Sequence, residues 1–234
     1  MSLASQIADS FAAAPPIRVV NYHNTPAYRA DDYDRELAAL AERYAPVTED
    51  DLAAFFASGH WAGGRPGVIV ALYNGYRNNH DVMRPLLERH GLVGWFFAVT
   101  GWTSCPPDDQ RAFAARRTLA LVPGEYADGR HALSWDELKS LDQGHVVASH
   151  TRNHARIAAD DADGQQAEIV GAQDDFREHL GHPVRSFAWL LSGTWGHSAP
   201  TDACLERAGY EFLFSDFKLQ RLPHARSSAN EKII

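Results

Sequence analysis

Short apolar runs alternate with amphipathic segments along most of the chain. Runs rich in β-branched or aromatic residues are typical of buried strands, whereas apolar residues that recur every three or four positions are typical of helices. Strands are therefore expected at residues 17–22, 68–72, 93–99, 145–148, 184–189 and 211–214. Helices are expected at residues 33–40, 48–56, 78–90, 109–117, 134–141, 163–180 and 200–208. Strands separated by helices predict an α/β fold in which crossover helices join a parallel sheet, open or closed into a barrel.

Residues at the ends of the expected helices support these boundaries. Thr48 precedes a run of acidic residues, as an N-cap does, and Ser134 with Glu137 has the spacing of a capping box. Gly181 and Gly209 follow two of the helices, where a glycine commonly ends a helix. The boundaries thus follow from local signals as well as from periodicity.

Three segments lie outside the alternation, and we expect them to belong to one domain that spans residues 1–234. Residues 1–16 are expected to form a short amphipathic helix closed by two prolines. Residues 103–132 mix prolines with charges, which indicates a long loop excursion over a site, and residues 215–234 are expected to form a C-terminal tail. No basic residue precedes Arg18, so we expect no signal peptide and a cytoplasmic protein.

Composition narrows the range of partners. The chain has 234 residues, 45% of them hydrophobic, which is enough for one sizeable core. It carries 22 basic against 30 acidic residues and a formal charge of -8, which works against nucleic acid or an anionic membrane surface as a partner. No apolar run approaches the ~18 residues that a membrane span needs. Neutral or cationic ligands fit this charge better.

The strongest candidate for chemistry is the segment His150-Thr151-Arg152-Asn153-His154, which follows an expected strand directly. Two imidazoles four positions apart on a helical turn project from one face and can share a metal ion. A chance pair is the alternative, because the chain holds 12 histidines. The place at the carboxyl end of a strand favours a site, since sites in parallel α/β folds gather there.

Several segments together resemble the motifs of one known family. They are Tyr22-His23, Gly75-Tyr76-Arg77-Asn78-Asn79, Leu133-Ser134-Trp135, His150-Thr151 with His154, and Phe187-Ala188-Trp189. From about residue 16 to residue 214 the chain resembles the polysaccharide deacetylases of the NodB-homology type, carbohydrate esterase family 4. The resemblance implies a distorted, TIM-like (β/α) barrel of about seven parallel strands. It also implies metal-dependent hydrolysis of N-acetyl groups on carbohydrate, with zinc or a similar divalent metal.

Departures from the family's pattern fall where its chemistry takes place. The family's motif Thr-Phe-Asp-Asp-Gly supplies a general base and then a metal ligand, and here Tyr73 stands at the base position and Asn74 at the ligand position beside His150 and His154. A phenol does not readily accept a proton from water at neutral pH, and an amide oxygen lacks the charge of a carboxylate. We therefore expect metal binding and hydrolysis to be weak or absent.

Further candidates concern the substrate and a general acid. Leu191 lies where Leu190-Leu191-Ser192 replaces the family's Pro-Tyr-Gly, a turn that resemblance links to oxyanion binding. Trp102, Trp189 and Trp195 are expected to stack on sugar rings, although a tryptophan in an α/β fold is more commonly part of the core. His224 is a weak candidate for the general acid, because Leu222-Pro223-His224 is one residue short of the family's Leu-x-x-His. A surface histidine is the alternative.

Substitutes for the missing base are few. His80 and Asp81 follow Asn74 by six and seven residues, but positions on the following helix usually point away from the strand ends. Two hypotheses therefore remain open. The protein is either a deacetylase acting on an acetylated amino-sugar polymer or oligomer, or a catalytically inactive relative that serves as a carbohydrate-binding or assembly protein.

Overall fold

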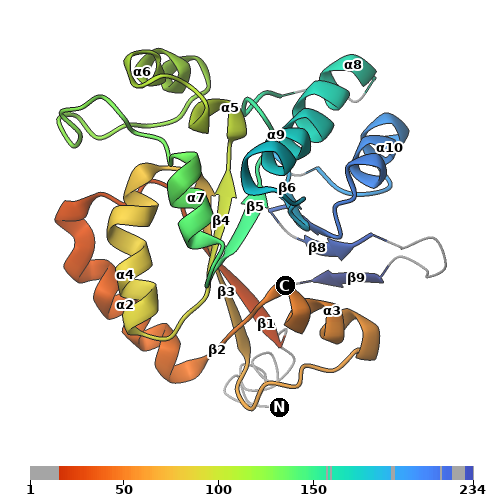
Figure 1. Ribbon diagram of the computed structural model, residues 1–234. Coiled ribbons are helices and arrows are strands. Elements are labelled where there is room, and N and C mark those ends of the chain that lie inside the picture. The colour runs from red at the N-terminus through yellow and green to blue at the C-terminus, as the bar shows by residue number, and fades with distance from the viewer. Residues whose placement is uncertain are drawn as a thin grey trace, which may run out of the picture.

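The computed structural model describes residues 16–156, 158, 160–190, 193–216, 218–222 and 230–233. Within them, one nine-stranded sheet runs in the order β1-β3-β4-β5-β6-β7-β8-β9, with β2 paired beside β3. The first seven strands pair in parallel and curl into a half-barrel (Figure 1), which confirms the expected distorted barrel. The parallel strands are β1 (Ile17–Tyr22), β2 (Ala45–Pro46), β3 (Gly67–Asn74), β4 (Gly94–Ala98), β5 (Val146–Ser149), β6 (Ser186–Ala188) and β7 (Phe212–Phe214).

Most of the helices cover the outer side of this curled sheet (Figure 1), whereas the helix over Glu49–Ser58 packs Leu52, Phe55 and Phe56 against the core inside it. Their ends follow the local signals: Thr48 and Ser134 each form a capping box, and Gly181 and Gly209 end their helices in the left-handed conformation. The segment expected as one helix over residues 163–180 consists of two α-helices joined by a π-helical turn. The elements are η1 (Ala27–Arg29), α2 (Ala30–Arg43), α3 (Glu49–Ser58), η2 (Asn79–Met83), α4 (Arg84–Arg89), α5 (Thr100–Thr103), α6 (Pro107–Arg116), α7 (Trp135–Leu141), α8 (Ala162–Gln165), η3 (Gln166–Val170), α9 (Gly171–Leu180) and α10 (Ala199–Ala208).

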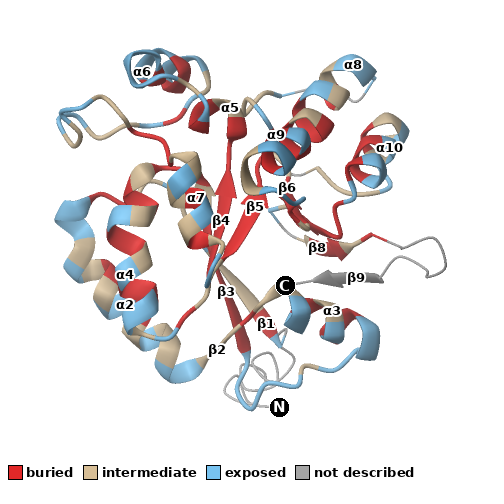
Figure 2. Ribbon diagram, viewed as in Figure 1, coloured by how far each residue is buried: buried red, intermediate tan, exposed pale blue. Residues whose placement is uncertain are grey.

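The core has two main parts, one on each face of the sheet. Along β3, Val68, Val70 and Leu72 pack into the cluster under the helices, whereas Ile69 and Ala71 pack into the cluster inside the half-barrel. This alternation is the two-residue period of a strand, and burial on both faces explains why the central strands are apolar throughout (Figure 2). The apolar runs therefore define a rigid frame whose strand ends are left to carry polar residues.

The expectation that residues 215–234 form a C-terminal tail is wrong for the first part of this segment. Residues Lys218–Arg221 form β8, which pairs antiparallel with β7 after a tight turn in which Ser215 N donates to Lys218 O at 2.9 Å. Leu219 is fully buried, so the segment closes one edge of the half-barrel core. Asn230–Ile233 forms β9 beside it. The segment is too short and too polar for its sequence period to reveal a strand.

The structure does not test the expectations for the N-terminus, for Leu191 or for His224. The expected N-terminal helix over residues 1–16 lies almost wholly outside the described residues, as do Leu191 and His224. Among the helices that the structure describes, none has the length and apolar character to cross a lipid bilayer.

Candidate functional site

The carboxyl ends of the parallel strands surround a cavity of about 290 Å³. Because parallel strands all point the same way, residues that follow different strands meet at one edge of the sheet. The last residues of β1, β3 and β7 contribute to it, and so do the segments that follow β1, β5, β6 and β7. The lining residues are Asn21, His23, Tyr73, Asn74, Thr118, His150, His154, Trp189, Leu190, Phe214, Ser215 and Asp216.

His150 and His154 lie in this cavity on a loop, so the expected helical turn is wrong. Thr151 and His154 adopt positive φ angles of 66° and 52°, and these left-handed residues prevent a helix. The two rings nevertheless meet, with centroids 5.2 Å apart. The two rings therefore come together through the left-handed residues of a loop, which the four-residue spacing in the sequence does not predict.

Backbone carbonyls fix the protonation of both rings. Nδ1 of His150 lies 3.0 Å from Ala188 O, and Nδ1 of His154 lies 3.0 Å from Arg117 O. A carbonyl only accepts, so each Nδ1 carries a proton and each neutral ring keeps its lone pair on Nε2. Burial, followed by the neighbouring His154, lowers the pKa of His150 to about 3, and burial also lowers the pKa of His154. Both imidazoles are therefore neutral acceptors.

A network of charged side chains holds the histidine loop in place. Asp175 accepts from Arg152 at 3.0 and 2.8 Å and from the Thr100 hydroxyl at 2.7 Å. Glu168 accepts from the backbone and the side chain of Asn153 at 2.7 and 2.8 Å. These bonds tie the residues between the two histidines to α9 and η3, and through Asp175 to the start of α5.

Tyr73 is held between aromatic rings in the cavity wall. Its ring stacks on Phe97 at 4.8 Å and on His23 at 5.4 Å, and it meets His150 edge-on at 5.2 Å. Burial, followed by the charge of Asp216, raises the pKa of Tyr73 well above its ordinary value. Tyr73 therefore stays a neutral phenol and does not take a proton from water at neutral pH.

Asn74 turns into the same cavity because it leaves the extended conformation. Successive strand residues normally face opposite sides of a sheet, but Asn74 has a φ of 76°, and both it and Tyr73 line the cavity. Its Oδ1 is buried and has no hydrogen-bond partner of standard geometry among the described residues. The Tyr76 hydroxyl nonetheless lies near this amide: burial raises the pKa of Tyr76, and Asn74 opposes that rise.

The donor set does not fit a tightly bound divalent metal. Asn74, His150 and His154 offer three neutral donors, and the amide oxygen of Asn74 is a weaker ligand for a dication than a carboxylate would be at the same position. In the described part of the chain, no carboxylate or thiol joins these two histidines in a cluster of metal-ligand spacing.

His23 and Asp216 are lining residues that the sequence analysis did not propose. His23 follows β1 directly, and burial lowers its pKa. Asp216 is exposed at the rim, two residues after β7. The sequence signal that could have identified them is their position just after two of the expected strands. At neutral pH, Asp216 is the one lining side chain among those described that carries a formal charge.

The three tryptophans have different surroundings. Trp189 lines the cavity. Trp102 does not, and its expected sugar contact is wrong, because the side chain is fully buried against Tyr76 and donates to Gln110 O of α6 at 3.3 Å. Trp195 packs against the core under the helices and is not among the residues that line the cavity.

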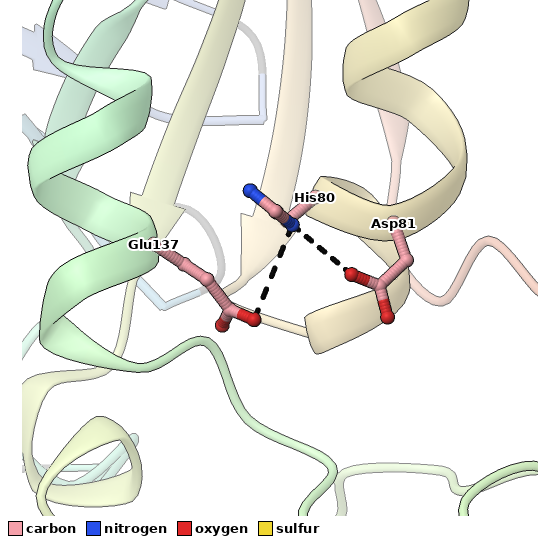
Figure 3. Close-up of side chains that lie close together, drawn as sticks. All are labelled: His80, Asp81 and Glu137. Atoms are coloured by element: carbon pink, nitrogen blue, oxygen red, sulfur yellow. Dashed lines mark hydrogen bonds and ion pairs between the residues drawn. The ribbon is translucent and has the colours of Figure 1, made fainter.

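Among the described residues, the one cluster with metal-ligand spacing consists of His80, Asp81 and Glu137, where side chains from η2 and α7 converge (Figure 3). Its carboxylates already have cationic partners: Arg130 binds Glu137 through two bonds of 2.7 Å, and Arg77 binds Asp81 at 3.1 Å. None of the three residues lines the cavity. The cluster is an ion-pair network that joins the two helical segments.

Comparison with known proteins finds a deacetylase family model and solved structures of deacetylases. The family model described as polysaccharide deacetylase matches residues 62–213. No curated protein matches. Among solved structures, the chain is similar to the deacetylase PplD from Streptococcus pyogenes, solved with acetate, at 15% identity and a TM-score of 0.65, with 88% of this chain and 85% of that chain covered. It is also similar to a de-N-acetylase from Aggregatibacter actinomycetemcomitans (14%, TM-score 0.63, 85% and 87% covered) and to IcaB from Ammonifex degensii (19%, TM-score 0.58, 85% and 83% covered). At these identities the structures show a shared fold.

Proposed function

Since the chain belongs to the polysaccharide deacetylase family, we propose that it binds carbohydrate and hydrolyses it weakly or not at all. The observation that carries this proposal is the state of Tyr73, which stands at the base position as a buried phenol stacked between His23 and Phe97. Asn74, at the ligand position, adds no negative charge. Two groups that the family's reaction requires are therefore replaced by neutral ones.

Their loss has a large expected effect on rate. General-base assistance contributes roughly 10²- to 10⁴-fold, and a metal that activates water contributes further. His23 is the neutral imidazole in the cavity whose ring protonation is not fixed by a backbone carbonyl. A His23→Gln variant tests whether this imidazole accepts a proton during hydrolysis.

Carbohydrate binding is supported by the shape of the strand-end region. A second cavity of about 290 Å³ adjoins the first, and both use Trp189 and Leu190 as walls. Its other lining residues include Phe187, Thr194 and His197. Each cavity is near the lower limit of about 300 Å³ for small-molecule sites. An indole between two small cavities suits two neighbouring sugar rings, since aromatic side chains combine apolar area with a polar edge.

Acetate release and calorimetric binding test the proposal on the same ligand, an acetylated chito-oligosaccharide. The parent, Asn74→Asp and the double variant Tyr73→Asp/Asn74→Asp are assayed with added zinc or cobalt. We expect binding without release by the parent, gain of metal affinity in the single variant, and measurable release by the double variant, limited by the altered turn at Leu190.

An Asp81→Asn variant is the matched control, because it removes a carboxylate from the ion-pair network and none from the cavity. It should leave both binding and release unchanged. Rapid acetate release by the parent, or failure of the parent to bind the oligosaccharide, would contradict the proposal.

A further inference from the structure

The cavity is lined by acceptors that lack donors. The Nδ1 contacts of His150 and His154 leave each Nε2 with a lone pair, and neither Nε2 has a hydrogen-bond partner among the described residues. Asn74 is 6% exposed, and its buried Oδ1, although the Tyr76 hydroxyl lies near the amide, has no hydrogen-bond partner of standard geometry in that part of the chain. Buried acceptors are normally satisfied. A ligand with several hydrogen-bond donors would therefore be the best complement to these acceptors.

The single negative charge of the lining residues favours a ligand with a single positive charge. Asp216 supplies one negative charge at the rim, and its field reaches the Tyr73 side chain inside. No ion pair with Asp216 occurs among the described residues. The indole of Trp189, which lines the cavity, adds a weaker attraction for cations. One carboxylate balances one positive charge, whereas a divalent ion would keep an uncompensated charge in a partly buried site.

A protonated primary amine has both properties, since it carries three N–H donors and a single positive charge. We propose that this cavity selects the free ammonium group of a de-N-acetylated amino sugar over the N-acetylated form. The inference rests on the proposed function, that the cavity binds carbohydrate. An N-acetyl group offers one N–H donor, carries no charge, and adds an acyl group that would compete for the space beside Asn74 and His150.

Calorimetry with two tetrasaccharides of equal length tests the selection. One is built of glucosamine and the other of N-acetylglucosamine, and both are titrated into the full chain at mildly acidic pH with a chelator present. We expect the amine form to bind at least about fivefold more tightly, because it alone satisfies the unpartnered acceptors. Tetralysine, which carries the same number of side-chain cations, should bind more weakly than the amine tetrasaccharide.

Two variants locate the selection in the cavity. Asp216→Asn should weaken binding of the amine form about two- to fivefold, as expected for an exposed charge pair, and should leave the acetylated form unaffected. Asn74→Gly removes the unpartnered amide while accepting the positive φ, and should also reduce the preference. Asp136→Asn is the matched control, because Asp136 has a 96% exposed side chain and does not line the cavity.

The outcomes separate this inference from the proposed function. If neither tetrasaccharide binds, the proposed function fails and the inference fails with it. If the acetylated form binds as tightly as the amine form or more so, the proposed function stands and the inference is overturned. It is also overturned if the preference survives in both cavity variants, if tetralysine binds equally well, or if zinc retained after chelation blocks the amine form.

Discussion

The carboxyl group of Glu49 predicts an unusual dependence of stability on pH. Glu49 begins α3 at the end of the sheet opposite the cavity, where its side chain is 17% exposed and accepts a hydrogen bond from Ser186. Burial raises its pKa to about 7 from an ordinary value of 4.5, and the Glu211 carboxylate adds to the rise, whereas Ser186 and Arg185 oppose it. The folded protein therefore holds this proton more tightly than the unfolded chain does.

The sign and size of the effect follow from that difference. Between about pH 4.5 and pH 7 the unfolded chain has lost this proton while the folded state keeps it, so stability falls as pH rises through this window. A gap of about 2.5 pH units at about 1.36 kcal/mol each corresponds to a loss of about 3 kcal/mol above pH 7. Glu49→Gln keeps an acceptor for Ser186 and removes the ionisation, so the variant should exceed the parent by about 2–3 kcal/mol at alkaline pH.

Urea unfolding followed by circular dichroism, at several pH values on both sides of neutrality, measures this difference. The two proteins should have nearly equal stability in mild acid and diverge as pH rises. Asp31→Asn is the matched control, because Asp31 is an exposed carboxylate in the first turn of α2 and loses the same helix-dipole interaction without any change in burial. Parallel pH profiles for the parent and Glu49→Gln, or a variant that is less stable than the parent at alkaline pH, would refute the reasoning.

Four other predictions concern the cavity and its support. Protein purified without added metal should contain well under one equivalent of zinc per chain by elemental analysis, because the donors are neutral. In NMR titrations the ring of His150 should stay neutral from alkaline pH down to about pH 4, since its pKa is lowered to about 3. Asp175→Asn should lower the free energy of unfolding by about 2 kcal/mol in urea, through lost charge-assisted bonds to the histidine loop. Trp102→Ala should cost about 3–5 kcal/mol of stability by leaving a core cavity, whereas Trp189→Ala should mainly weaken oligosaccharide binding, about two- to tenfold by calorimetry.

The sequence by itself determined the elements and the chemistry of individual positions. The strand at residues 17–22, the capping boxes at Thr48 and Ser134 and the glycine after α9 were all predictable, because each depends on neighbours a few positions away. A parallel sheet was also predictable, because recurring strands and helices allow few arrangements, whereas the family and the curled barrel were predicted from motifs such as His150-Thr151 with His154. That Tyr73 and Asn74 bring no carboxylate required no structure at all.

Only the tertiary structure decided which residues share the cavity and in what state. His23 and Asp216 lie far apart in sequence and meet because the carboxyl ends of parallel strands share one edge of the sheet. The ring protonation of His150 depends on the Ala188 carbonyl of a neighbouring strand, and the burial of Trp102 depends on α6 packing over it. Local periodicity carries information over a few residues, whereas burial, charge and hydrogen bonding in this cavity arise from contacts between segments that only the folded chain brings together.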